Sequence, residues 1–352
     1  MQKLKFYQEA IRISGMNHDK TEFAYLFPSQ SSWEIALKSF REDKELAAII
    51  DVIDRETEEE LGSSFVTALY ETPEELWRNK DFPPKTTHNA TVLHRCFEHV
   101  LSRELGREPI PPKETAGHSL GLLANLVAIK VCSYREGLRL SIRLGNLLEN
   151  SPTNGGMFAV AGLQEGVVQE ICSWANSLLP KDNSWETRIV NFNSPKLFII
   201  AGAEAGLKHA ADRAKSVGAT VRRIAEYQYH HKVAMADVTA GLAATIDKLH
   251  FSDPCTPVRS FVTAESMHTG DQIKNEFLDL EGSPVGSQVF WYREPHKLSV
   301  IQTMISQGVE DFVVFSRELR NWLRGASINV YLVSSLESLK SKVKSLAEKA
   351  KR

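Results

Sequence analysis

Several features that would narrow the function of this chain of 352 residues are scarce in it. Its 42 Lys and Arg residues nearly balance 44 Asp and Glu residues, so no excess of positive charge favours nucleic acid as a partner. No stretch approaches the roughly 18 uninterrupted apolar residues of a membrane span. Charges and amides also interrupt Met1–Ala10, which therefore lacks the apolar core of a signal peptide. We expect a cytoplasmic globular protein with neither a nucleic-acid nor a membrane partner.

Cysteine is also rare, and nothing in its spacing indicates a metal or disulfide role. No Cys-x-x-Cys pair occurs among the four cysteines, which are Cys96, Cys132, Cys172 and Cys255. Most lie among apolar or small residues, so we expect buried free thiols. The histidines at positions 88, 94 and 99 do not share one helical face. The sequence therefore predicts no metal site.

The most informative motif that is present runs from Gly117 to Gly121 and places Ser119 between two glycines. The residues before it, Lys113–Ala116, suit a short strand, and Leu120–Val131 has the leucine pattern of a helix. A strand, a sharp turn and a helix in this order form a nucleophile elbow, in which the helix N-terminus faces the developing oxyanion. This pattern predicts Ser119 as a nucleophile.

Other segments extend the pattern into a family resemblance. Phe27-Pro28-Ser29-Gln30-Ser31-Ser32 and the Gly-His-Ser-Leu-Gly motif resemble two signatures of the malonyl-CoA:acyl-carrier-protein transacylase family, which includes the acyltransferase domains of polyketide synthases. The resemblance covers roughly residues 21–335. Four further segments match that family in order and spacing: Asn89–Leu101, Gly156–Leu163, Val190–Pro195 and His231–Met235.

The predicted fold class is α/β. The resemblance implies an α/β-hydrolase-like core over residues 21–153 and 223–334, with a ferredoxin-like subdomain inserted at residues 154–222. The sequence itself suggests the same insertion, because strands and helices are expected there in the order β-α-β-β-α-β. The helices of this part are predicted at Gln164–Leu179 and Glu204–Val217, and its middle strands at Thr187–Val190 and Leu197–Ala201.

Three other segments complete the expected organisation. Residues 1–20 form a polar N-terminal extension without a recognisable motif. Ser133–Glu136 has the spacing of a capping box and is expected to start a helix that runs to about Glu149. Residues 335–352 are predicted to form a basic amphipathic helix, which either covers the core or contacts an acidic carrier protein.

The resemblance also implies the catalytic roles. Ser119 is the nucleophile, His231 is its general base, and the backbone N–H groups of Leu120 and Gln30 form the oxyanion hole. His230 is adjacent to His231, and neighbours on an extended segment point to opposite sides, so only one can face Ser119. Met235 favours His231 as the base by its family spacing.

Two further assignments follow from the resemblance. His230 then lines the acyl pocket, together with Asn89. Asp279 replaces an amide in the segment near which the family holds its catalytic imidazole, so it is either an orienter of His231 or a surface carboxylate. No bound cofactor is expected. The substrate is an acyl-CoA, the partner is an acyl carrier protein, and its phosphopantetheine thiol is the acceptor.

The sequence departs from the family at Leu144. Members that use malonyl groups carry an arginine twenty-five residues after the serine, where the guanidinium binds the free carboxylate. Arg143 is adjacent, but one residue on a helix is a rotation of about 100°, which places Arg143 on another stripe. An unpaired carboxylate in an apolar pocket is costly, so we expect an enzyme that is not selective for malonyl groups.

Three functions fit these residues. The leading interpretation is a ping-pong acyltransferase that moves an acyl group through Ser119 to a carrier thiol. A hydrolase that removes acyl groups from carrier proteins would use the same serine and histidine, with water as the acceptor. A non-catalytic, partner-binding homologue is the third alternative, motivated by the altered residues around Gln30 and by Lys232 and Asp279.

Overall fold

The computed structural model describes about half of the chain. The described ranges are 22–27, 112–117, 121–133, 155–180, 186–225, 240–260, 263–282, 300–314 and 328–332. Shorter described runs are 55, 58–59, 136–137, 139–140, 143, 147, 320, 323, 341–342, 344–346 and 348. The predicted extension at 1–20 and the three histidines at 88, 94 and 99 lie outside these residues.

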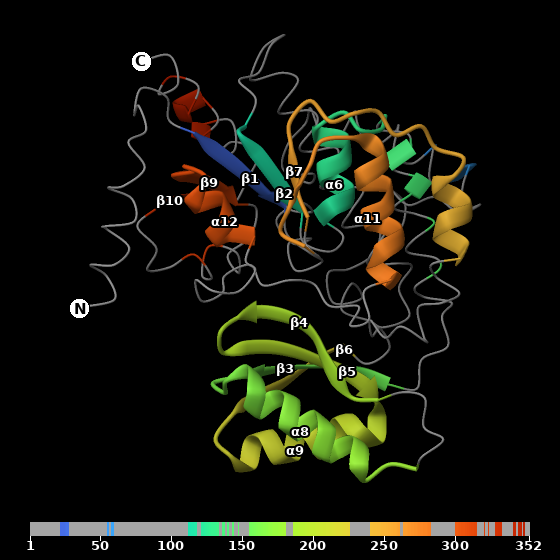
Figure 1. The fold of residues 1–352 in the computed structure, drawn as a ribbon, viewed down its shortest axis with the longest axis vertical. Coiled ribbons are helices and arrows are strands. Elements are labelled where there is room, and N and C mark those ends of the chain that lie inside the picture. The colour runs from blue at the N-terminus through green and yellow to red at the C-terminus, as the bar shows by residue number, and fades with distance from the viewer. Residues whose placement is uncertain are drawn as a thin grey trace.

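A six-stranded sheet forms the larger part of the fold, in the order β10-β9-β1-β2-β7-β8 (Figure 1). Its strands are β1 (Phe23–Phe27), β2 (Glu114–Gly117), β7 (Val258–Arg259), β8 (Ser266–Met267), β9 (Asp311–Val314) and β10 (Asn329–Leu332). All neighbours are parallel except β7 and β8. Every residue of β1 and β2 is buried, as expected for central strands covered on both faces.

Helices pack against both faces of this sheet. Helix α12 (Val300–Ser306) contributes Val300 and Met304 to an apolar core with Leu26 of β1 and Phe312 of β9. The side chains of β1 that alternate with Leu26 point to the opposite face. Helix α6 (Gly121–Ala128) contacts β1 and β2, and α11 (Gly270–Gly282) lies beside α6 (Figure 1).

The second sheet is smaller and entirely antiparallel, in the order β4-β5-β3-β6. Its elements follow the predicted β-α-β-β-α-β order: β3 (Gly155–Ala161), α8 (Glu165–Ser177), β4 (Arg188–Ser194), β5 (Leu197–Ala203), α9 (Glu204–Ser216) and β6 (Thr220–Ala225). Strand β4 continues four residues beyond the predicted end at Val190. Asn191 and Phe192 also pair with β5, across irregularities in its register, and this pairing extends the strand.

Both faces of the small sheet carry buried apolar side chains. Helices α8 and α9 cover the face that is turned away from the larger sheet (Figure 1), where Phe198 and Leu207 are completely buried. On the opposite face, Val190 and Ala201 are buried as well, and Met157 packs against them. A sheet with two apolar faces requires cover on both, so the small unit also packs on its second face.

Helix α6 ends three residues earlier than the predicted Val131. Lys130 has a left-handed φ of 63°, and its N–H donates to the carbonyl of Val127. The N–H of Val131 donates to the carbonyl of Leu126. This is the Schellman arrangement, in which a residue past the helix end satisfies its last carbonyl groups. No glycine marks this end in the sequence, because Lys130 occupies the left-handed position.

The prediction of buried free cysteines is correct for two residues and wrong for one. Cys132 and Cys172 are free and buried, and burial raises the pKa of the Cys172 thiol to about 12. Cys255 is free but exposed. It lies between Pro254 and Pro257 in a connecting segment before β7, outside any helix or strand. Cys96 lies outside the described residues.

Candidate functional site

The candidate site is built around the turn that joins β2 to α6. Gly117 is the last residue of β2 and Gly121 is the first of α6. A Cβ atom placed on Gly117 would lie 2.5 Å from the backbone nitrogen of Leu122, and closer still to the carbonyl oxygen of Gly121. The strand and helix therefore meet backbone against backbone, which only glycine permits at this position. Such a turn is as sharp as a nucleophile elbow requires.

Helix α6 is packed into the interior behind this turn. Leu122, Leu123 and Leu126 are almost completely buried, and they anchor the helix between the sheet and its other neighbours. The free N–H groups and the positive end of the helix dipole lie at the turn. This end can stabilise negative charge that develops beside residues 118–120.

The end of β1 lies beside the end of β2. Phe27 pairs with Gly117 in the parallel register, so the two strands finish at the same edge of the sheet. Gln30 follows Phe27 by three residues and Leu120 follows Gly117 by three. The connections that carry the two predicted oxyanion-hole residues thus start from adjacent points.

A buried polar contact ties α11 to the same edge. Ser260 follows β7, which pairs with β2 through Val258 and Thr115. The Ser260 hydroxyl lies 2.9 Å from each carboxylate oxygen of Glu276 in α11, and both residues are buried. The hydroxyl also accepts a hydrogen bond of 3.0 Å from the backbone of Thr263. Sequence analysis missed this contact, because the two residues are separated by a loop and neither belongs to a motif.

The predicted site residues themselves lie almost entirely outside the described residues. Asp279 is part of α11, three residues after Glu276, but its side chain is not described. The others are Ser119, Leu120, Gln30, His230, His231, Asn89 and Leu144. Their roles stay predictions, and the described elements show only where the chain enters and leaves the positions of Ser119 and Leu120.

The surroundings of Leu144 are partly described. Leu140 is completely buried, whereas Arg139 and Arg143 are exposed. Leu147 packs against Gly241, because a Cβ there would lie 2.5 Å from a Leu147 methyl carbon. The two arginines therefore share an outer stripe of this helix, and the leucines share an inner one. This agrees with the separate stripes expected from the sequence.

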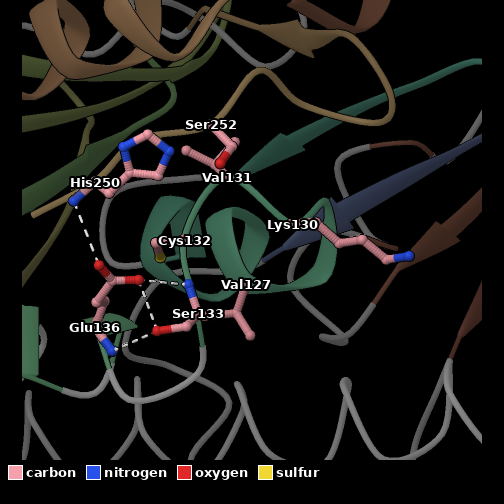
Figure 2. A pocket seen from close by; sticks show the side chains of 8 residues that line it. All are labelled: Val127, Lys130, Val131, Cys132, Ser133, Glu136, His250 and Ser252. Atoms are coloured by element: carbon pink, nitrogen blue, oxygen red, sulfur yellow. Dashed lines mark hydrogen bonds between the residues drawn. The ribbon is translucent and has the colours of Figure 1, made fainter.

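A pocket of about 380 Å³ lies at the opposite end of α6, away from the turn (Figure 2). It is lined by Val127, Lys130, Val131, Cys132, Ser133, Glu136, His250 and Ser252. Its wall contains the predicted capping box. The backbone N–H of Ser133 donates to the Glu136 carboxylate at 2.8 Å, and the Glu136 N–H donates back to the Ser133 hydroxyl at 3.3 Å. The capping box in this wall stabilises the start of the next helix.

The Glu136 carboxylate also accepts a hydrogen bond from the backbone N–H of His250 at 3.3 Å. Partial burial opposes ionisation of Glu136, but the hydrogen bonds from Ser133 and His250 outweigh it and lower the pKa of the carboxyl. The capping box thus joins the helix that carries Leu144 to the segment before β7.

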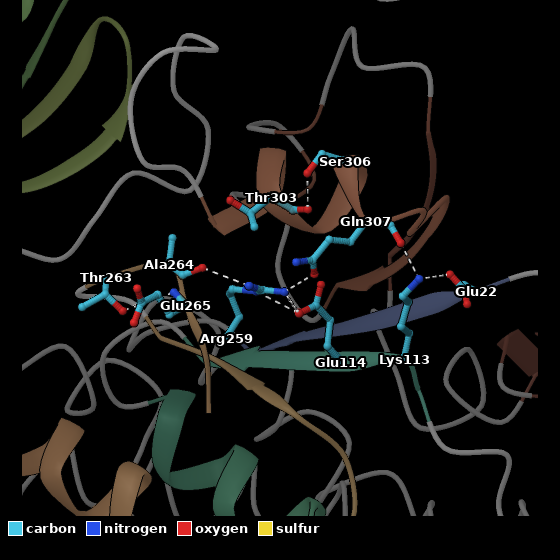
Figure 3. A network of polar contacts seen from close by, with 10 residues as sticks. All are labelled: Glu22, Lys113, Glu114, Arg259, Thr263, Ala264, Glu265, Thr303, Ser306 and Gln307. Carbon is cyan, nitrogen blue, oxygen red and sulfur yellow. Dashed lines mark hydrogen bonds and ion pairs between the residues drawn. The ribbon is translucent and has the colours of Figure 1, made fainter. Parts of the chain in front are cut away.

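A second polar network occupies the opposite edge of the large sheet, where β2 begins (Figure 3). Glu114 and Arg259 form a buried ion pair, with one contact of 2.8 Å, and Arg259 also bonds to Gln307. Lys113 pairs with Glu22 nearby. Burial raises the pKa of Glu114, and the charges of Arg259 and Lys113 oppose that shift. This network joins β2, β7 and the end of α12, so its role is structural.

Searches of known proteins agree with the geometry. No protein-family model matches the chain. A malonyl CoA-acyl carrier protein transacylase of Haemophilus influenzae is 25% identical over 268 residues, which cover 75% of this chain and 81% of that protein. The enzyme of the same name from Escherichia coli K12 is 25% identical over 297 residues, or 82% of this chain and 87% of that protein.

Solved structures show the same fold. The malonyl CoA-acyl carrier protein transacylase of Coxiella burnetii has a TM-score of 0.72 at 21% identity, covering 94% of this chain and 99% of that one. A type II polyketide synthase malonyl-transacylase, solved in complex with its acyl-carrier protein, has a TM-score of 0.75 at 22% identity and covers 92% and 99%. In sequence and in fold, the chain is thus similar to the malonyl-CoA:acyl-carrier-protein transacylases.

Proposed function

We propose that the protein is a serine acyltransferase, which moves an acyl group from a CoA thioester to the phosphopantetheine thiol of an acyl carrier protein. The observation that carries this proposal is the backbone contact of Gly117 with Gly121 and Leu122, because it forms the turn that a nucleophilic Ser119 requires. The names of the homologues, which are transacylases acting on a carrier protein, support the same reaction class.

The proposed reaction has two half-reactions. Ser119 Oγ attacks the thioester carbon while His231 takes its proton, and the tetrahedral oxyanion is bound by the N–H groups of Leu120 and Gln30. The C–S bond then breaks, and the proton on His231 passes to the CoA thiolate. The carrier thiol attacks the Ser119 ester in the reverse sense, which regenerates the serine. Asp279 orients His231 in this scheme.

The acyl pocket is proposed to accept neutral groups better than malonyl. Leu144 replaces the arginine that would bind a malonyl carboxylate, and the exposure of Arg143 gives that carboxylate no partner on the inner stripe. The pocket would also include Asn89 and His230. In this preference the protein would differ from its homologues, whose names give malonyl-CoA as the substrate.

The proposal also divides the chain into a core domain and an inserted subdomain. The large sheet with its helices would be the α/β-hydrolase-like core, residues 21–153 and 223–334, and the small sheet the ferredoxin-like subdomain at residues 154–222. The acceptor partner is an acyl carrier protein, and the reaction is cytoplasmic. In the C-terminal segment, buried Leu346 faces the core and exposed Lys344 faces outward, as an amphipathic cover requires. Among the described residues, no helix is long and apolar enough to cross a membrane.

Intact-protein mass after incubation with an acyl-CoA tests the proposal. A persistent adduct on wild type that Ser119→Ala abolishes, and that a holo carrier protein removes, supports the transferase. A transient adduct with release of free acid indicates the hydrolase. No adduct at all indicates the non-catalytic homologue. His231→Ala should slow adduct formation by orders of magnitude and His230→Ala much less. The reverse order would assign the base to His230.

A further inference from the structure

Helix α6 carries a buried polar side chain for which the described residues supply no hydrogen-bond partner. Asn125 has no exposed surface, and neither its amide oxygen nor its amide nitrogen has a hydrogen-bond partner among the described residues. The hydroxyl of Thr115 in β2 is in the same condition. Buried polar groups in native proteins are almost always hydrogen-bonded to protein or to ordered water.

Thr115 lies on the face of the sheet that α6 covers. Gly117 points at the first turn of α6, and side chains two residues apart on a strand share a face. Tyr25 pairs with Thr115 in the parallel register of β1 and β2, so it lies on the same face. Tyr25 is buried, and burial raises the pKa of its hydroxyl, which keeps it protonated as a donor.

Asn125 lies about as far from the turn along α6 as Thr115 lies from it along β2. It is one turn beyond Gly121 on the same face of α6, a rise of about 6 Å. Thr115 lies about 6.6 Å back along β2 from Gly117. Helix α6 runs antiparallel to the strands. Its C-terminal end lies beside the start of β7, because the carbonyl of Ile129 accepts a hydrogen bond of 3.0 Å from the backbone N–H of Cys255, shortly before β7 begins. Asn125 therefore comes to lie over Thr115.

We propose that Asn125, Thr115 and Tyr25 together hold one buried water between α6 and the sheet, and that this contact makes Asn125 and Thr115 positioning residues for the nucleophile. A water molecule has two donors and two acceptors, which suit an amide and two hydroxyl groups. The contact lies directly behind the turn, so it fixes the height of α6 above β2. The water site stands on the structure alone, and the positioning role rests on the proposed function.

A crystal structure at high resolution tests the water site without any assay of activity. The expected result is one density peak within hydrogen-bond distance of the Asn125 amide and the Thr115 and Tyr25 hydroxyls. In Thr115→Val we expect this peak to be absent and the fold to be unchanged. A wild-type structure in which the three groups pack dry overturns the proposal.

Stability provides a second test, because Thr115→Val conserves the shape of the side chain. Thr115→Val and Asn125→Leu should each lower the melting temperature, and the double variant should be no less stable than the weaker single one, since both remove the same water. If the groups were truly unsatisfied, apolar replacements would be neutral or stabilising. Additive losses or a raised melting temperature would contradict a shared water.

The positioning role is tested by the single-turnover rate of acylation, measured well below the melting temperature. Thr115→Val should slow acylation by about tenfold, because small misplacements of reacting groups are costly. Thr115→Ser should restore the rate. Thr187→Val is the matched control, since Thr187 is an equally buried threonine beside the small sheet. An unchanged rate in Thr115→Val, or an equal loss in the control, refutes the role; an inactive wild type would instead reject the proposed function.

Discussion

At the scale of single residues, the absence of one methyl group at Gly117 decides the shape of the candidate site. Gly117→Ala places a Cβ within 2.5 Å of the Leu122 nitrogen, where only backbone atoms could yield. We expect a loss of about 1–3 kcal/mol in the free energy of unfolding, as for other overpacked sites. Acyl-enzyme formation should fall strongly as well, because the turn must open.

Gly166→Ala in α8 is the matched control. Apart from the adjoining residues and the backbone of its own helix, a Cβ at that position would meet no atom within 4 Å, and alanine is the better helix former. Denaturant unfolding should show this variant equal to or more stable than wild type. Equal behaviour of the two variants would contradict the close turn.

A second residue-scale prediction concerns acyl specificity. Wild type should be acylated faster from a neutral acyl-CoA, such as acetyl-CoA, than from malonyl-CoA, because Leu144 cannot pair a carboxylate. Leu144→Arg should shift the ratio of catalytic efficiencies toward malonyl by roughly ten- to a hundred-fold, as a charge-assisted hydrogen bond would. Arg143→Ala serves as the control, since exposed Arg143 should not change the ratio. A wild-type preference for malonyl-CoA would refute the specificity proposal.

At the scale of elements, features that depend on residues close in sequence were more often predictable than features that depend on contacts between distant segments. The capping box at Ser133 and Glu136 was predictable, because it depends on two residues three positions apart. The early end of α6 was not, because Lys130 takes the place that a glycine usually marks. Likewise, the Ser260–Glu276 contact depends on how β7 and α11 meet in space, which no local spacing encodes.

The capping box should contribute a pH-dependent share of stability. The folded state lowers the pKa of Glu136, so its contribution is present above the ordinary glutamate pKa and is lost as the pH falls through the lowered value. Glu136→Gln should therefore lower the melting temperature near neutral pH, by an amount matching about 1 kcal/mol. The difference from wild type should vanish in acid. Exposed Glu170→Gln on α8 is the control for the loss of a surface carboxylate and should leave the melting temperature near neutral pH unchanged. A difference between wild type and Glu136→Gln that stays constant at all pH values would argue against the capping role.

At the scale of the whole molecule, the fold consists of two sheets with separate helical cover. The order of elements in the small sheet was predictable from the alternation of apolar patterns, and the structure has the same order. The strand order of the large sheet was not, because its strands are short and come from segments far apart in the chain. Most predicted site residues lie outside the described residues, so sequence and resemblance alone support their roles.

The second buried face of the small sheet predicts that the two parts unfold together. Val190→Asp puts a charge at a position only 2% exposed, so the single melting transition should shift down by several degrees or more. Val167→Asp on α8 is the control, since that side chain is 38% exposed and should tolerate the charge. Calorimetry that resolves two transitions, only one of them shifted, would show that the parts unfold independently.

The central claim is that Ser119 carries the acyl group, and one measurement tests it most directly. The wild-type protein is incubated with acetyl-CoA, quenched and digested, and tandem mass spectrometry locates the label. We predict acetylation at Ser119, which disappears when a holo acyl carrier protein is added and reappears on its phosphopantetheine thiol. Label on another residue, or label at Ser119 that the carrier protein cannot remove, would contradict the account.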